Sequence, residues 1–484
     1  MENLKEKTAR GLMWSTVNNG SAQLLNLIVG VFLARLLTPE DYGIVGVLTV
    51  FSAVAMTLQT SGFSQALVNE RKPVDADYNS VFWFNILVSL LLYVLLFLCA
   101  PLIAAFFHQP CLVAVSRVLF LSLPVYALGV TSGAYLIKNM MNREIAVIGL
   151  SAIILSGFTA IVLALNGFTY WSLVAQQLVA AVVTIAGRYY YVRWLPKLRI
   201  DFGPVRRMFS FSARLLITNL IQIFNFHLLT FIFGRFLPIQ TVGYYSQANK
   251  WNNLAKTTIA DAVGQVAQAV LVSVSDERER EVRVFRKMMR FTAFLSFPAM
   301  LGLALVSREF ILFVLGSQWA DSVPLLQILC VGGAFLPFYT LYQNVAISSG
   351  RSDLYMWCSI GQMLIQLAIV LVTYPYGINT ILWCCSAFNI LWLLPWQIVA
   401  HRLIGVRLRD VLKDVLPFLM VVIVVMAFTY MLTTWIESYI LMLVVRIGIF
   451  ALVYIGLMKL LRVKIMEECI DFVLKKRRGY DSNV

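Results

Sequence analysis

The chain has 484 residues and a formal net charge of +15, and 60% of its residues are hydrophobic while only 13% are charged. That charged share is about half of what a soluble domain carries, and apolar runs of about 20 residues recur along the whole length. Composition therefore predicts an all-α polytopic membrane protein. Membrane topology, rather than a nucleic-acid partner, accounts for the excess of basic residues.

The lengths of the apolar runs predict about fourteen transmembrane helices, with twelve as the alternative count. In chain order they cover residues 12–36, 42–68, 79–107, 113–138, 143–165, 168–192, 209–236, 241–272, 287–315, 322–347, 353–374, 377–401, 411–434 and 438–461. The connections are too short for a soluble catalytic domain, and the sequence carries no P-loop or dinucleotide fingerprint. The seven cysteines lack metal-ligand spacing. We expect no enzymatic activity, no cofactor and no metal.

Basic residues are distributed unevenly between the two sides of the predicted bundle. With the N-terminus in the cytoplasm, the inner loops and adjoining helix ends hold about 31 of the 39 Lys and Arg residues. The outer side then holds Arg35, Arg235 and Arg308. Both termini are therefore expected in the cytoplasm. Arg35 and Arg235, at outer helix ends, either gate a cavity or anchor their helices at the interface.

An offset of 200 residues indicates an internal repeat. Phe32–Gly43 aligns with Ile232–Gly243, and an Arg, a Leu and a Gly recur in that register. The same offset places Asn219 over Asn19 and Gln265 over Gln65. An offset of six helices predicts two parallel six-helix lobes around a central cavity. The expected domains are residues 1–199, residues 200–402, and residues 403–484 with two additional helices and a basic tail.

The stretch Tyr244–Gln268 is polar where a membrane span is expected. On a helical wheel one face carries Ser246, Lys250, Asn253, Thr257, Asp261, Gly264 and Gln268, with Asn249 and Lys256 beside it. A Lys or Asp near the centre of a lipid-facing helix costs about 2.5–3.5 kcal/mol. We therefore expect this face to line a cavity.

The first, second and seventh predicted spans also carry polar stripes. The candidate cavity-lining residues are Asn19, Gln23, Asn26, Gln65, Gln222, Asn225, Asn249, Asn253, Thr257 and Gln265. Each of these could instead bond to a neighbouring helix, as Asn, Gln and Thr often do in membranes.

Three basic residues, Arg214, Lys250 and Lys256, predict a cationic substrate site suited to phosphate or pyrophosphate. Arg214 lies nearer a helix end, so a structural role is the equal alternative for it. Asp261 either pairs with one of these bases or couples transport to a proton or sodium gradient.

Five segments resemble the oligosaccharide flippases of the polysaccharide-transport family, colanic-acid exporter type. They are FLARLLTPEDYGIVGV (32–47), GFSQALV (62–68), VLVSVSDERER (270–280), LGSQWADSVPLLQIL (315–329) and SSGRSDL (348–354). That family belongs to the superfamily of the multidrug-and-toxin extrusion exporters. The resemblance implies alternating access of two six-helix lobes in a bacterial inner membrane. It also implies outward transfer of an undecaprenyl-pyrophosphate-linked glycan, with basic cavity residues on the pyrophosphate and the first, second, seventh and eighth helices lining the cavity.

The expected partners are this lipid-linked glycan, the bilayer and polysaccharide polymerase machinery. A multidrug antiporter on the same fold would need a cavity dominated by acids. A membrane-embedded glycosyltransferase or polymerase would need sizeable outer loops. A lipid II flippase shares the fold and mechanism, and it stays open as an alternative.

Overall fold

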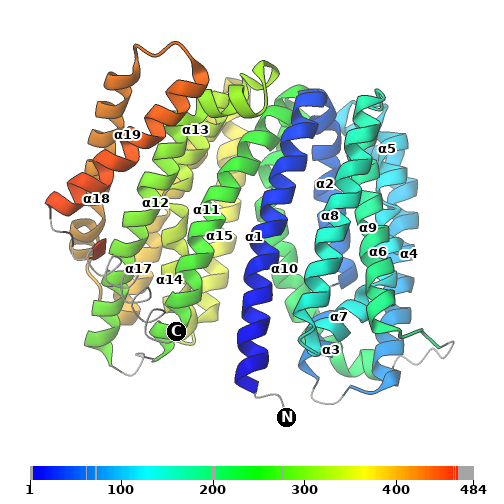
Figure 1. The fold of residues 1–484 in the computed structure, drawn as a ribbon. Coiled ribbons are helices and arrows are strands. Elements are labelled where there is room, and N and C mark those ends of the chain that lie inside the picture. Colours follow the sequence, from blue (N-terminus) through cyan, green and yellow to red (C-terminus); the bar gives the residue numbers. More distant parts are fainter. Residues whose placement is uncertain are drawn as a thin grey trace, which may run out of the picture. The chain divides into compact units, whose positions relative to one another are not determined.

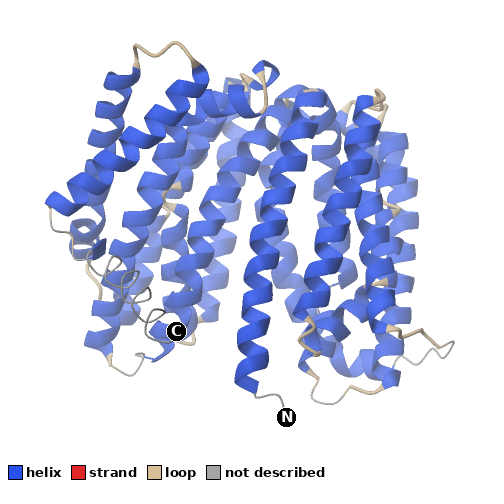
Figure 2. Ribbon diagram, in the orientation of Figure 1, coloured by secondary structure: helices blue, strands red, loops and turns tan. Residues whose placement is uncertain are grey.

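The computed structural model describes residues 4–60, 63–70, 73–197, 203–273, 277–461, 463 and 465–466. Within these residues every regular element is a helix (Figure 2). The chain folds as two compact units, Met1–Ser246 and Gln247–Val484. The all-helical prediction is confirmed for the described residues. The expected lobe boundaries, after residues 199 and 402, stay predictions.

The first unit holds ten helices and the first turns of an eleventh among its described residues (Figure 1). They are α1 (Leu4–Leu36), α2 (Pro39–Thr60), α3 (Phe63–Asn69), α4 (Asp75–Phe107), α5 (Leu112–Leu119), α6 (Ser122–Leu128), α7 (Val130–Lys138), α8 (Asn142–Leu165), α9 (Trp171–Val192) and α10 (Gly203–Phe236). Helix α11 (Ile239–Ser273) begins in this unit and continues into the second.

The second unit continues with eight further helices and two single 3₁₀ turns among its described residues. They are α12 (Arg278–Val314), η1 (Ser317–Trp319), α13 (Ser322–Gly333), α14 (Leu336–Ser348), α15 (Ser352–Thr373), η2 (Tyr374–Tyr376), α16 (Ile378–Leu391), α17 (Leu393–Ile404), α18 (Leu408–Thr433) and α19 (Tyr439–Leu460).

Each predicted span falls on one helix or on a closely spaced series of helices. Ten of the described stretches are long and apolar enough to cross a membrane, and an eleventh is the pair Leu112–Leu128 and Val130–Lys138, bent by 46°. The remaining predicted spans coincide with α1, α10 and α11, which are not among these stretches; the part of α1 from Gly20 to Leu36 is apolar but shorter. The count of fourteen therefore stays a prediction.

A side chain from α9 forms a hydrogen bond at the bend between α6 and α7. The guanidinium of Arg188 donates from Nη1 to the carbonyl oxygen of Gly129, at 2.7 Å. The same oxygen accepts the backbone N–H of Gly133 at 2.9 Å, so Arg188 adds a second hydrogen bond at the bend.

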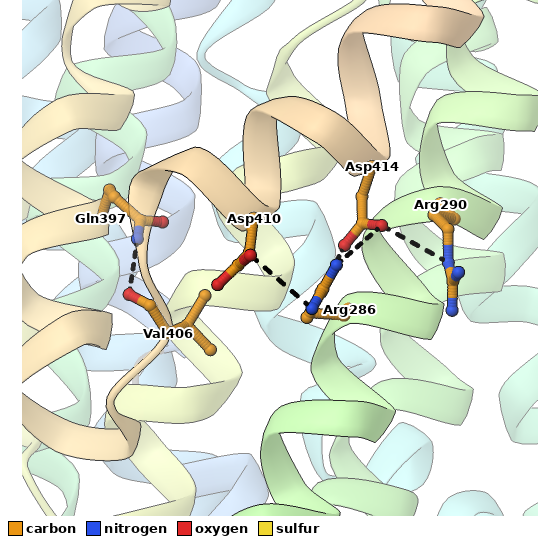
Figure 3. A network of polar contacts seen from close by, with 6 residues as sticks. All are labelled: Arg286, Arg290, Gln397, Val406, Asp410 and Asp414. Atoms are coloured by element: carbon orange, nitrogen blue, oxygen red, sulfur yellow. Dashed lines mark hydrogen bonds and ion pairs between the residues drawn. The ribbon is translucent and has the colours of Figure 1, made fainter.

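The two additional C-terminal helices, α18 and α19, are attached to α12 by charged side chains near both ends of α12. Figure 3 shows the first group, in which Arg286 donates from Nε to Asp414 Oδ2 at 2.6 Å. Arg290 Nε lies 3.9 Å from Asp414 Oδ1, and Arg286 Nη1 lies 3.9 Å from Asp410 Oδ1. These contacts tie the first turns of α18 to α12.

The second group lies about 35 Å further along α12, by the rise of a helix. There Arg446 of α19 forms a 2.9 Å ion pair with Glu309 of α12. Arg446 also donates from Nε to the hydroxyl of Thr433 on α18, at 2.9 Å. One guanidinium therefore connects all three helices inside the second unit.

Candidate substrate site on helix α11

One side of α11 is packed into the second unit. Trp251 and Asn252 are buried there, as are Ile259 and Val263 further along the helix. The indole of Trp251 packs edge-to-face against Phe310 of α12, with ring centroids 4.8 Å apart. The burial of Ile259 and Val263 places the apolar face of the helical wheel against the bundle, as the sequence pattern predicts.

The opposite side of α11 is polar and open. Lys250, Thr257 and Asp261 are exposed, and Asn253 and Lys256 are half-buried. In the described part of this helix no large hydrophobic side chain is exposed. A helix facing lipid would show the reverse, because hydrocarbon solvates apolar side chains and excludes charges. The exposed face of α11 therefore suits water or a polar ligand.

Helix α10 provides the contrast in the first unit. Its exposed large side chains include Phe224, Phe226 and Phe236. These alternate with the exposed Gln222 and the half-buried Asn225. This helix presents a mixed surface, whereas the open face of α11 is polar throughout its described length.

The charged groups on α11 have no ionic partner among the described side chains. Lys250, Lys256 and Asp261 take part in none of the ion pairs within 4.0 Å there. Lys256 and Asp261 are five residues apart, a spacing that places them about 140° apart around the helix axis. The expected alternative of a pair between Asp261 and either lysine is thus absent from this conformation.

Hydroxyl groups on the same face are already satisfied by the helix backbone. Thr257 donates to the carbonyl oxygen of Asn253, and Thr258 donates to that of Leu254, each at 2.7 Å. The amide oxygen of Asn253 has no hydrogen-bond partner within the described part of the chain. The two ammonium groups are therefore the strongest donors that this face offers to a ligand.

The other candidate residues fall into two groups. Gln23 and Asn26 on α1, and Gln65 on α3, are exposed, and Asn249 on α11 is half-buried. The side chains of Asn19, Arg214 and Gln265 lie outside the described residues, although their backbones belong to α1, α10 and α11. The joining of Arg214 to the two lysines, and one cavity lined by four helices, stay predictions.

Arg235 contacts the C-terminal end of α4 within the first unit. It donates from Nη1 to the carbonyl oxygen of Phe106, at 2.9 Å, and its guanidinium lies 5.1 Å from the centre of the Phe106 ring. The same nitrogen lies 2.8 Å from Nδ1 of His108. Arg235 thus fixes the end of α10 to the C-terminal end of α4. Arg35 is exposed.

Sequence reasoning missed a contact between the first turns of α2 and α11. A Cβ atom built on Gly43 would overlap the carbonyl oxygen of Ile239, and one built on Gly243 would overlap that of Pro39. The register of the repeat had aligned the two glycines. That they lie at one interface is visible only in the folded chain.

A family model described as "Polysaccharide biosynthesis protein" matches residues 32–324, which is more than half of the chain. The chain belongs to this polysaccharide biosynthesis protein family. The family assignment confirms the resemblance expected from the sequence. Together with the apolar helices, it identifies a multi-pass membrane protein of bacterial type.

Relatives of this chain come from several bacteria. The chain is 26% identical to the succinoglycan biosynthesis transport protein ExoT of Rhizobium meliloti (strain 1021), over 81% of this chain and 80% of the relative. It is 26% identical to the lipopolysaccharide biosynthesis protein WzxC of Escherichia coli (strain K12), over 72% of each. It is 24% identical to the teichuronic acid biosynthesis protein TuaB of Bacillus subtilis (strain 168), over 82% and 84%.

Two solved structures resemble this chain in fold. The lipid II flippase MurJ in an inward closed conformation matches with a TM-score of 0.74 and 16% identity, over 96% of this chain and 99% of MurJ. A multidrug-resistance MATE-family transporter of the MOP superfamily matches with a TM-score of 0.62 and 16% identity, over 79% and 94%. These matches show that the chain shares its helical fold with the two structures. None of the names describes an enzymatic reaction, in agreement with the expectation from the sequence.

Proposed function

We propose that this protein moves an undecaprenyl-pyrophosphate-linked oligosaccharide from the cytoplasmic to the outer leaflet of a bacterial inner membrane by alternating access. The observation that carries this proposal is the open polar face of α11, on which Lys250 and Lys256 have no ionic partner among the described residues. Two unpaired lysines in one membrane helix are costly, and a bound anionic substrate would lower that cost.

The chemistry of the substrate matches this face. A pyrophosphate carries several acceptor oxygens, and each ammonium group can donate to them in charge-assisted hydrogen bonds. The glycan needs polar neighbours, which Asn253 and Thr257 supply. The polyprenyl tail is apolar and stays in the bilayer, so the protein moves only the polar head.

Family membership supports a polysaccharide precursor as the cargo. Among the relatives, ExoT is named a transport protein for succinoglycan biosynthesis, and among the structural neighbours MurJ is named a lipid II flippase. We extend the flippase mechanism to this chain and place both termini in the cytoplasm, as the basic residues indicate. The flipped glycan would then be delivered to polymerase machinery at the outer leaflet.

A charge-removal experiment tests the proposal. In cells lacking the native gene, the double variant Lys250→Ala/Lys256→Ala should abolish surface glycan, while lipid-linked oligosaccharide accumulates and protein abundance is unchanged. The matched control is Lys459→Ala, which removes an exposed lysine from the end of α19. The Lys250→Arg/Lys256→Arg variant keeps both charges and should retain part of the activity. Normal surface glycan in the double Ala variant would refute the charge assignment.

Two alternatives are separated by the same strains. A lipid II flippase on this fold would rescue growth when the cell's own lipid II flippase is depleted. A multidrug antiporter would lower sensitivity to cationic dyes, but the described open face of α11 has two lysines and one carboxylate, the wrong charge balance for a cation. We expect neither rescue nor dye resistance.

A further inference from the structure

We propose that the first turns of α2 and α11 form the outer gate of this transporter, and that Gly43 and Gly243 are the residues that let it shut. The inference rests on the proposed alternating access, and it assigns a specific closing contact to that cycle. The contact lies within the first compact unit, on the side that the distribution of basic residues assigns to the outside.

The contact is reciprocal under the 200-residue repeat. Gly43 faces the carbonyl oxygen of Ile239, and Gly243 faces that of Pro39, so each copy presents a glycine to the first residue of the other helix. Residues 39 and 239, and residues 43 and 243, are equivalent in the repeat. Such an exchange is what a two-fold axis between the two helix starts produces.

One further pair of equivalent residues meets along the same two helices. A Cβ atom built on Gly46 would lie 3.0 Å from Oγ of Ser246, its own equivalent in the repeat. Val242 is fully buried, and Gly43, Gly46 and Gly243 are buried as well. The interface is thus closed to water in this conformation, and only glycine allows the two backbones to approach so closely.

Local interactions hold the backbone at the starts of α2 and α11. Thr38 and Asp41 form a capping box at the start of α2: the backbone N–H of Thr38 donates to Asp41 Oδ2 at 2.8 Å, and that of Asp41 donates to Thr38 Oγ1 at 3.3 Å. Pro39 and Pro238 fix the backbone where the two helices begin. Helix starts held in this way can part and meet again without unfolding, as a gate between two states requires.

The contact also explains why the first turns of α11 belong to the first unit. The repeat assigns α11 to the second lobe, yet its residues up to Ser246 group with α2. When the outer side opens, these turns must leave α2. A side chain at residue 43 or 243 blocks the shut state and leaves the open state unhindered, so it shifts the population towards open.

Double electron–electron resonance measures this population directly. The spin labels go on Glu40→Cys and Gln240→Cys, two exposed and repeat-equivalent positions, after replacement of the seven native cysteines. The parent protein should show a dominant short distance. Gly43→Ala or Gly243→Ala should lower the ratio of short to long distances by about 5- to 150-fold. Gly448→Ala, where a Cβ atom would meet nothing within 4 Å, should leave the ratio unchanged.

A double variant with a compensating substitution controls for misfolding. Gly46→Ala should give a smaller shift, because it presses only on the Ser246 hydroxyl, and Ser246→Ala should restore the parent distances in the double variant. Unchanged distances in both Gly43→Ala and Gly243→Ala overturn the gate, whatever happens to the surface glycan. Longer distances with normal surface glycan support the gate and overturn the proposed flipping function.

Discussion

Arg446 and Glu309 form an ion pair that is almost completely buried: the two side chains are 7% and 4% exposed, and their closest atoms are 2.9 Å apart. The second carboxylate oxygen of Glu309 has no hydrogen-bond partner among the described atoms, so its charge depends on Arg446. Buried charges held this way are costly to separate.

Removing either partner should therefore destabilise the second unit strongly. Arg446→Ala or Glu309→Ala should each lower the free energy of unfolding by about 3–5 kcal/mol, because the remaining charge is left buried. The double variant Arg446→Met/Glu309→Met should lie much closer to the parent. Thermal unfolding of detergent-purified protein checks the order of stabilities, and a double variant that is the least stable of the set would contradict it.

Lysine charges on α11 should be detectable by ligand-induced stabilisation. Undecaprenyl pyrophosphate at a concentration about 100 times its dissociation constant should stabilise the purified protein by about 2.7 kcal/mol. Lys250→Ala/Lys256→Ala should lose most of this stabilisation, whereas Lys459→Ala should keep it. Undecaprenol lacks phosphate and serves as the matched ligand. Equal stabilisation by the alcohol would mean that the tail, and not the charge, is recognised.

Asp261 should act in transport rather than in folding. It is exposed and pairs with neither lysine of its own helix in this conformation. Asp261→Asn should change the free energy of unfolding by less than about 0.5 kcal/mol, as surface substitutions do. It should also reduce flipping driven by an imposed proton or sodium gradient in proteoliposomes. A large loss of stability with normal gradient-driven flipping would return Asp261 to the role of a structural counter-ion.

Arg235 should serve as an anchor between α10 and α4. Loss of its hydrogen bond to the carbonyl oxygen of Phe106 should cost about 1.5–3 kcal/mol of stability, since the donor is charged. Surface glycan should remain in Arg235→Ala wherever the protein accumulates normally. Absent surface glycan at normal abundance would instead support a gating role for this residue.

The sequence predicts the positions of the helices well wherever hydropathy alone determines them. The span predicted at residues 79–107 lies within one helix, Asp75–Phe107. The polar face predicted for α11 leaves Lys250 and Asp261 exposed, while Val263 is buried. Both results follow from periodicity, which is a local property of the chain.

Contacts between distant segments could not be predicted in this way. The ion pair of Arg446 with Glu309 could not be predicted, because nothing near either residue in the sequence indicates its partner. Gly43 and Gly243 were aligned by the repeat, yet a shared register does not state which backbones touch. Pairing of this kind depends on how helices pack, which periodicity does not encode.

The attachment of α18 and α19 has a consequence for attempts to shorten this protein. Deleting everything after α17 would retain twelve predicted spans, the number of helices in the two repeats. It would also remove Asp414 from Arg286 and Arg290, and it would leave the buried carboxylate of Glu309 without Arg446. A shortened version of this protein would therefore first require an uncharged residue at position 309 of α12.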